Sequence, residues 1–268
     1  MKKIVLFLIL SGTSLFSFAQ ELKLSREIKL PFSPAFSSID QSGNVYLVSD
    51  RGLIVKYSDK GDSLLAFSPK KNSPITLIDA SSGIRPFIFY KDFQEYAFLD
   101  QFLTSASSNT FYPDLVGFAD YAAASSDNNI WLVDANDFSI KKYNLTTNTL
   151  DIISPLNLIL DQDDYQITQM REYQNLLFIY DMEKGLYIFD TYGSLYKRLN
   201  LSKVPFISFF DESVLYPLDG YLVFMNIYSG SKVGIPLPAI EIAHVLQNAN
   251  VIYLIGADRM GIYTLNAK

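Results

Sequence analysis

The chain of 268 residues contains no cysteine, one histidine and one tryptophan, and only 19% of its residues are charged. Without cysteine, disulfide frameworks, cysteine-ligated zinc sites, iron–sulfur clusters and thiol nucleophiles are excluded. A Ser–His–Asp mechanism would have to use His244, the single imidazole. The formal net charge of −6 also argues against nucleic-acid binding, because phosphate contacts need a footprint of Lys and Arg.

Apolar and aromatic residues are abundant instead. The hydrophobic share is 49%, with 20 Phe and 18 Tyr, which is enough to build a sizeable core and excludes a disordered chain. The length fits one compact domain.

The amino terminus has the pattern of a cleaved signal peptide. Lys2 and Lys3 precede an unbroken apolar run at residues 4–10, and Ser17 and Ala19 supply small residues before a cleavage point. The run is too short to cross a bilayer, and no later stretch is long and apolar enough to be a membrane helix. We therefore expect a signal peptide at 1–19, a single mature domain at 20–268, and export to the periplasm or the extracellular medium.

A pattern of paired apolar strands recurs along the mature chain. Each unit has a polar turn, a strand with an aromatic residue near its start, an acidic or glycine-containing turn and a second strand. The anchor residues at 42, 43, 47, 45 and 30-residue intervals are Val45, Phe87, Ile130, Leu177, Leu222 and Ile252. This period is typical of β-propeller blades, and turn signals divide each unit into four strands, named a to d outward.

The sixth unit supplies only three strands, at 241–246, 251–255 and 260–265. An additional strand pattern at 22–30 stands before the first unit and has no partner there. Because an open ring would leave costly unpaired strand edges, we expect this amino-terminal strand to complete the last blade. The predicted fold is all-β: a six-bladed β-propeller of four-stranded blades, with the last blade closed by the N-terminal strand.

The segment IWLVDAND…IKKYNLTTNTL at 130–150 carries a family resemblance. Across essentially the whole mature chain, the repeat style resembles bacterial exported six-bladed β-propellers of the NHL/YVTN-like group. The resemblance implies the fold and an exported context, while the activities of such propellers are too diverse to carry over. The tryptophan docking motif of quinoprotein propellers cannot form with Trp131 alone, so no quinone or other cofactor is expected.

An acidic residue recurs at the predicted turn between strands b and c. The set comprises Asp50, Asp92, Asp134, Asp181 and Asp258, with Asn226 in the fifth unit. A ring of carboxylates at one mouth of the channel could bind a cation or a basic ligand. The same spacing arises if each Asp accepts hydrogen bonds from its own turn, and repetition in every blade favours this structural interpretation.

Two further features have both a functional and a structural interpretation. Asp161, Asp163 and Asp164 could supply part of a Ca²⁺ site, but they lack the rest of an EF-hand loop, and a solvated acidic connector is favoured. His244 lies on a predicted inner strand, where Glu241, three residues earlier, would point to the opposite face, so a structural or channel-lining role is favoured over a catalytic one.

Two functional hypotheses follow. The first is a non-catalytic exported interaction or scaffold module that binds a protein or glycan of the cell envelope. The alternative is a carboxylate- or metal-dependent propeller hydrolase or lyase that uses Asp79, Asp120 and Glu241. We assign no catalytic, cofactor or metal residue. We expect no nucleic-acid partner and no transmembrane segment, and the oligomeric state stays open, with a monomer compatible.

The binding face is predicted from loop length and chemistry. Turns between strands b and c lie on the same face as the connections between blades, and this face collects mixed charge, long connections and exposed tyrosines, which suit recognition. The predicted ligand face comprises Asp50, Arg51, Lys91, Tyr112, Asp134, Tyr165, Asp181, Lys184 and Arg259.

Overall fold

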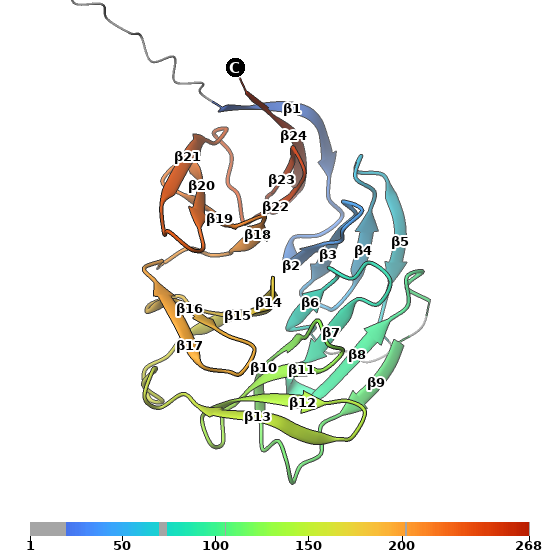
Figure 1. The fold of residues 1–268 in the computed structure, drawn as a ribbon. Helices are drawn as coiled ribbons and strands as arrows, with labels where there is room; N and C mark the ends of the chain where they lie inside the picture. The colour runs from blue at the N-terminus through green and yellow to red at the C-terminus, as the bar shows by residue number, and fades with distance from the viewer. Residues whose placement is uncertain (1–19, 70–73, 105, 202, 268) are drawn as a thin grey trace, which may run out of the picture.

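The computed structural model describes residues 20–69, 74–104, 106–201 and 203–267, so the predicted signal peptide lies outside the described residues. The described strands form six antiparallel sheets of four strands each, and the sheets are arranged as the blades of a ring (Figure 1). The predicted six-bladed β-propeller is confirmed.

The blades follow one another along the chain, and their strands run from the axis outward. Blades one to three contain β2 (Pro34–Ile39), β3 (Val45–Ser49), β4 (Ile54–Tyr57), β5 (Ser63–Phe67), β6 (Leu77–Asp79), β7 (Phe87–Tyr90), β8 (Glu95–Leu99), β9 (Ala106–Thr110), β10 (Ala119–Ala124), β11 (Ile130–Asp134), β12 (Ser139–Asn144) and β13 (Thr149–Pro155). Blades four and five contain β14 (Ile167–Tyr173), β15 (Leu176–Asp181), β16 (Gly185–Phe189), β17 (Leu195–Leu199), β18 (Ser208–Phe210), β19 (Ser213–Leu218), β20 (Tyr221–Asn226) and β21 (Lys232–Pro236). Blade six contains β22 (His244–Asn248), β23 (Val251–Ile255), β24 (Arg259–Ala267) and β1 (Gln20–Lys29).

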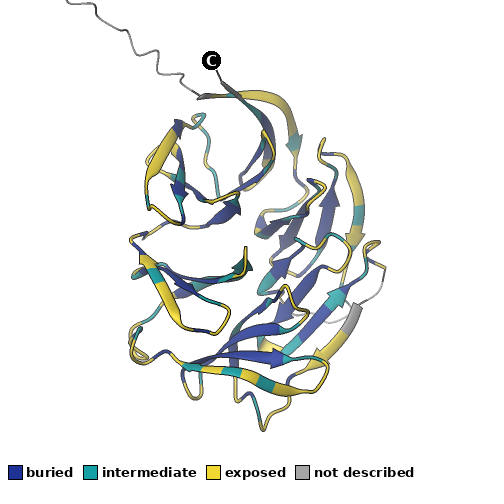
Figure 2. Cartoon of the chain, viewed as in Figure 1, coloured by how far each residue is buried: buried dark blue, intermediate teal, exposed yellow. Residues whose placement is uncertain are grey.

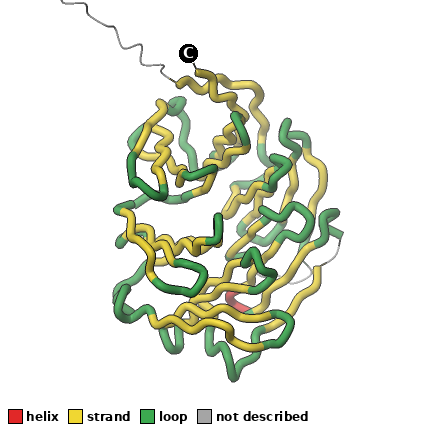
Figure 3. Tube along the Cα trace, viewed as in Figure 1, coloured by secondary structure: helices red, strands yellow, loops and turns green. Residues whose placement is uncertain are grey.

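Because successive strands are antiparallel, the loops divide between two faces of the ring. We call the b–c face the one that carries the b–c turns and the connections between blades. The a–b face carries the a–b turns and the c–d turns. The described residues contain one 3₁₀ turn, η1 (Lys91–Phe93), and are otherwise strands and loops (Figure 3). Within the same residues, no helix is long and apolar enough to cross a membrane.

The ring closes as the sequence predicts. Strand β1 pairs antiparallel with β24, in a register that places Leu22 opposite Leu265 and Ile28 opposite Met260. The amino-terminal strand therefore supplies the outer strand of the last blade, and the two ends of the described chain lie beside each other (Figure 1).

The core lies between the blades. Buried apolar residues form six clusters, each made by two neighbouring blades, and one of them joins the last blade to the first. Strands b and c are covered on both faces, so strands such as β3 and β11 are buried throughout. The outer strands alternate or are mostly exposed, as Figure 2 shows. Burial on two faces explains why the b and c strands have continuous apolar sequences.

The fifth blade differs from the predicted division. Its b strand is β19, and the segment around Leu222, anchored as a b strand, is strand c. The b strands begin at Val45, Phe87, Ile130, Leu176, Ser213 and Val251, so the irregular 30-residue interval disappears. The real b–c turn is Asp219-Gly220, with φ of 49° and 78° as in a type I′ hairpin. Pro217 lies within β19 and lacks a backbone donor, which weakens the strand pattern there.

This correction moves Asn226 from the predicted acidic ring to the end of strand c, on the opposite face. In blade six the inner strand begins at His244 rather than at residue 241, so Glu241 lies in the connection before it.

Removing residues 20–29 should destabilise the ring, because β24 would keep an unpaired edge and lose apolar cover from Leu22 and Ile28. We expect the melting temperature to fall by about 10 °C or more, with aggregation. Differential scanning fluorimetry and size-exclusion chromatography measure both.

Arg26→Ala is the matched control. Its Nη1 donates to the Lys60 carbonyl and to Asp62 at 2.8 Å, but both side chains are exposed, so the cost should stay within about 1 kcal/mol. A truncated chain that stays monomeric with an unchanged melting temperature would contradict the closure role of β1.

Candidate functional site: a funnel at the a–b mouth of the ring

A cavity of about 570 Å³ opens on the a–b face, where the a–b turns of all six blades converge. Its lining is rich in carboxamides and hydroxyls and includes the rings of Phe98, Phe209 and Phe210. The carboxamides are Gln41, Asn128, Asn129, Gln174, Asn175, Gln247 and Asn248. We call this cavity the funnel.

The tight a–b turns explain the amide-rich rim. Asn128, Gln174 and Asn175 have positive φ values of 64°, 49° and 61°. Asn tolerates this left-handed conformation better than most residues, because its short polar side chain bonds locally. The same turns that reverse the chain therefore place amide side chains around the mouth.

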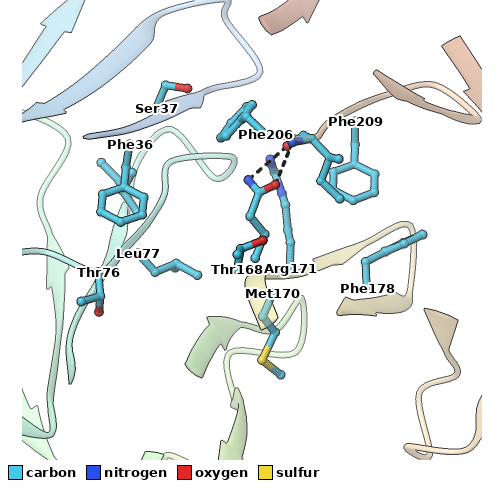
Figure 4. Close-up of a pocket in the computed structure, with 13 residues that line it drawn as sticks. Phe36, Ser37, Thr76, Leu77, Thr168, Met170, Arg171, Phe178, Phe206 and Phe209 are labelled. Carbon is cyan, nitrogen blue, oxygen red and sulfur yellow. Dashed lines mark hydrogen bonds between the residues drawn. The ribbon is translucent and has the colours of Figure 1, made fainter. Parts of the chain in front are cut away.

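Below the funnel, a narrow cavity of about 60 Å³ continues between the inner strands, and the two share Arg171 and Phe209. Figure 4 shows Thr168, Met170 and Arg171 of β14 at its centre, with Leu77 on one side and Phe209 on the other. The Gln169 side chain makes two hydrogen bonds with the backbone of Ile207: its Nε2 donates to the carbonyl at 3.3 Å, and its Oε1 accepts from the amide at 2.7 Å. Dashed lines in Figure 4 mark these bonds.

Three carboxylates line the funnel, and each accepts at least one hydrogen bond from the chain. Asp40 accepts hydrogen bonds from the Ser42 and Asn44 amides at 2.9 Å, and from the Tyr46 hydroxyl at 3.2 Å. Burial, and then the charge of Asp40, raises the pKa of Tyr46 well above its usual range.

Glu172 is held in the same manner. It accepts from the Ser125 hydroxyl at 2.5 Å, the Ser126 amide at 2.9 Å and the Trp131 indole at 2.6 Å. Burial alone would raise its pKa, but these bonds hold the pKa of Glu172 below its ordinary value. The single tryptophan thus ties blade three to blade four.

The third carboxylate, Asp79, meets Arg171 of the next blade but one. Asp79 ends β6 in blade two, and its Oδ1 accepts from the Ser81 amide at 2.9 Å. The Arg171 guanidinium of blade four stands 3.6 Å from the same Oδ1 and 5.9 Å from the Phe209 ring. This ion pair is long for a charge-assisted hydrogen bond.

Several buried polar atoms of the inner strands have no hydrogen-bond partner among the described residues. They are Thr168 Oγ1, Arg171 Nε, Ser208 Oγ and Gln247 Oε1, and a fifth, Tyr216 Oη, lies on the neighbouring b strand. Buried polar groups are normally bonded to protein or to ordered water, so water or another small polar group would complete the bonding of these atoms.

On the opposite, b–c face, the structure brings together two of the predicted ligand-face residues. Lys91 forms an ion pair with Asp120, and the Tyr165 hydroxyl donates to the other oxygen of the same carboxylate at 3.1 Å. Burial, followed by the charge of Asp120, raises the pKa of Tyr165 to about 12.

Asp134 and Asp181, two other predicted residues, are completely buried. Asp134 accepts from the Gly117 and Phe118 amides at 2.8 and 3.0 Å and from Lys141 Nζ at 2.7 Å. Asp181 likewise accepts from the Gln166, Glu183 and Lys184 amides at 2.7–2.9 Å. These carboxylates fasten each blade's entry connection to its b–c turn, which is the structural interpretation of the acidic repeat.

The remaining predicted residues are spread around the ring. Asp50 and Arg51 are exposed, Lys184 pairs with Asp164, and Arg259 pairs with Asp258 and Glu27. Tyr112 is 54% exposed and lies in a groove at the outer edge of blades two and three, which shares Arg85 and Phe98 with the funnel.

The three carboxylates of the hydrolase or lyase hypothesis do not meet. Asp79 lines the funnel, Asp120 pairs with Lys91 toward the other face, and Glu241 lies in the connection before β22. Among the described residues, no group of three or more His, Asp or Glu side chains could hold a metal ion. Within the 161–164 segment, Asp161 accepts from the Asp163 amide at 3.0 Å and Asp164 binds Lys184.

His244 is 7% exposed and fixed by its neighbours. Its Nδ1 lies 2.8 Å from the Ser37 hydroxyl, and its ring stacks on Phe206 with centroids 4.4 Å apart. Burial lowers the pKa of His244 from 6.5 to about 4. The imidazole is therefore neutral and joins the last blade to the first.

Comparison with solved structures identifies relatives in fold. Virginiamycin B lyase from Staphylococcus aureus is 10% identical, with a TM-score of 0.59, over 92% of this chain and 100% of that chain. A catalytically inactive histidine-to-alanine variant of that lyase with quinupristin is 11% identical, with a TM-score of 0.57, over 88% and 83%. The extracellular domain of a putative one-component system from B. thetaiotaomicron is 13% identical, with a TM-score of 0.56, over 87% and 33%.

No family model matches the chain, and no curated protein matches it in sequence. At these identities, the likeness to the solved structures shows the propeller fold alone.

Buried and exposed aspartates of the b–c turns should contribute very differently to the free energy of unfolding. Asp134→Ala leaves three backbone amides without their acceptor and the buried Lys141 with only Asp137 as its carboxylate partner, and should cost about 3–5 kcal/mol of unfolding free energy. Asp50→Ala, at the exposed counterpart, should stay within about 0.5 kcal/mol. Urea denaturation measures both; equal losses would contradict the structural role of Asp134.

The buried imidazole of His244 should make the free energy of unfolding depend on pH. Its pKa is about 4 in the folded protein and 6.5 in the unfolded chain, so the unfolded chain binds the proton first as pH falls. Stability should be lost between pH 6.5 and pH 4, by up to about 3 kcal/mol. His244→Gln lacks this term, so its stability deficit relative to the parent, measured by denaturation at several pH values, should shrink as pH falls. A constant deficit would contradict the prediction.

Proposed function

We propose that the chain is an exported, non-catalytic binding module whose ligand, a glycan or protein segment of the cell envelope, enters the funnel on the a–b face. The observation that carries the proposal is that Arg171 and Gln247, which line the funnel, each have a buried polar atom without a partner among the described residues. Buried polar atoms without hydrogen bonds lower the free energy of unfolding. A polar ligand that bonded them would stabilise the ring.

The funnel's chemistry favours a glycan. Amides and hydroxyls, like sugar hydroxyls, both donate and accept hydrogen bonds, and the rings of Phe98, Phe209 and Phe210 offer apolar surface for sugar C–H groups. A volume of about 570 Å³ lies within the usual range of small-molecule sites.

Export rests on the amino-terminal pattern of Lys2, Lys3, the apolar run at 4–10 and the small residues Ser17 and Ala19. The fold shared with an extracellular domain is compatible with it. The periplasm or the extracellular medium is the proposed location.

A lyase activity like that of the structural neighbours has less support. The lyase variant that lacks a histidine is described as inactive, whereas the single histidine of this chain is buried against Phe206 and is bonded to Ser37. The candidate carboxylates are also separated between the two faces. Binding is therefore preferred to catalysis.

Filling the funnel tests the proposal. Ser126 lines its wall and is exposed, so Ser126→Trp should occupy the mouth without disturbing the core. The chain 20–268, labelled and applied to arrays of immobilised lipopolysaccharide and peptidoglycan fragments, should bind at least one class of glycan. We expect Ser126→Trp to lose at least tenfold in affinity.

The matched control lies on the predicted ligand face. Arg51→Ala, Tyr112→Ala and Arg259→Ala, combined in one variant, change exposed side chains outside the funnel and should leave binding intact. If this triple variant loses binding and Ser126→Trp keeps it, the b–c face is the binding surface. If no glycan binds, or if the chain turns over the bound glycan, the glycan-binding proposal fails.

A further inference from the structure

We infer that the funnel selects acidic sugars, with Arg171 as the group that holds the ligand's carboxylate and Arg85 at the rim. The inference rests on the proposed function and specifies its ligand. The funnel lining includes three carboxylates and two guanidinium groups. The inference starts from the difference in how many hydrogen bonds these two kinds of group make within the chain.

Two of the three carboxylates have little bonding capacity left. Asp40 and Glu172 each accept several hydrogen bonds from the chain, and Lys56 stands 3.8 Å from Asp40. Asp79 accepts one hydrogen bond from the Ser81 amide and faces Arg171. A cationic ligand would therefore have to displace existing donors at Asp40 or Glu172, or Arg171 at Asp79.

The guanidinium groups, in contrast, are underused. Arg171 Nε is buried without a partner among the described residues, and the nearest carboxylate oxygen to the guanidinium, on Asp79, is 3.6 Å away. Arg85 is exposed, lies 3.8 Å from the Phe98 ring centroid, and has no carboxylate within 4.0 Å among the described residues. A guanidinium offers five donors in a planar fork that fits a carboxylate in two bonds.

The surroundings of Arg171 strengthen its pull on an anion. The guanidinium stands beside Phe209 above a cavity lined mainly by apolar side chains such as Phe36 and Leu77 (Figure 4). Electrostatic attraction is stronger where water is displaced from such a site. An incoming carboxylate would compete with Asp79 for Arg171, since both bind the same donors.

The unpartnered Gln247 Oε1 in the funnel lining needs a donor, which a hydroxyl group of the ligand would supply. A sugar acid offers hydroxyls of both capacities beside its carboxylate, and the amides of the rim match further hydroxyls. An acidic peptide would supply the carboxylate but fewer such hydroxyls.

The experiment compares glucuronate with glucose, a neutral sugar of the same ring, by isothermal titration calorimetry on the chain 20–268. We expect glucuronate to bind at least tenfold more tightly. Arg171→Gln should abolish this preference. Asp79→Asn should increase glucuronate affinity several-fold, because it removes the competing charge while keeping the side-chain oxygen that can bond the Ser81 amide. Arg51→Gln, outside the funnel, is the matched control and should change nothing.

The opposite responses at Arg171 and Asp79 separate ligand binding from folding damage, because a merely destabilised ring would bind less in both variants. Weaker glucuronate binding in Asp79→Asn, or equal affinity for the two sugars, would overturn the inference. Equal affinities that Ser126→Trp abolishes would still support the proposed function. If an acetylated dipeptide with a free carboxylate binds through Arg171 and glucuronate does not, the assignment to sugars is wrong.

Discussion

Contact between neighbouring blades is the interaction on which the rest of this structure depends. A twisted sheet of four strands cannot cover both of its own faces, and each apolar cluster here is completed by the next blade. The clusters become continuous only when the ring is closed, because the last one joins β23 and β24 to β3 and β4. Strand β1 adds backbone hydrogen bonds to this packing, because it pairs with β24 of the last blade and leads directly into the first blade.

Closure also determines where polar groups can gather. The b and c strands are occupied by inter-blade packing, and the d strands face outward, so the inner strands alone converge on a shared space. Register shifts in β2, β10 and β14 fall near the start of each strand, and those in β10 and β14 place Asp120 and Thr168 outside regular pairing. Arg171 and Asp79, 92 positions apart, face one another only because the ring brings the inner strands of blades two and four together near the axis.

The sequence was sufficient for the features that repeat. Continuous apolar strands, turn spacing and the unmatched strand at 22–30 predicted six blades and their closure, because these follow from local pattern and edge pairing. The fifth blade was misdivided because β18 has three residues and β19 contains Pro217, so the local strand signal was weak. The funnel was not predicted, since its residues come from turns and strand ends of six separate blades and no local motif links them. Burial of Asp134 and Asp181 was equally invisible, because exposed and buried aspartates occupy the same position in the repeat.

This chain shares its fold with lyases and with an extracellular domain at only 10–13% identity. The reason is that different residues maintain the ring and line its axis. Inter-blade packing requires apolar b and c strands but specifies few individual residues, so sequences can diverge while the ring persists. The a–b turns need residues that tolerate tight reversal, and beyond that their side chains are free to vary. Ligand choice in such a ring is therefore set by a few side chains at the axis. In the proposed site of this chain those would be Arg171 and the amides of the funnel, where Arg171 Nε and Gln247 Oε1 have no partner among the described residues.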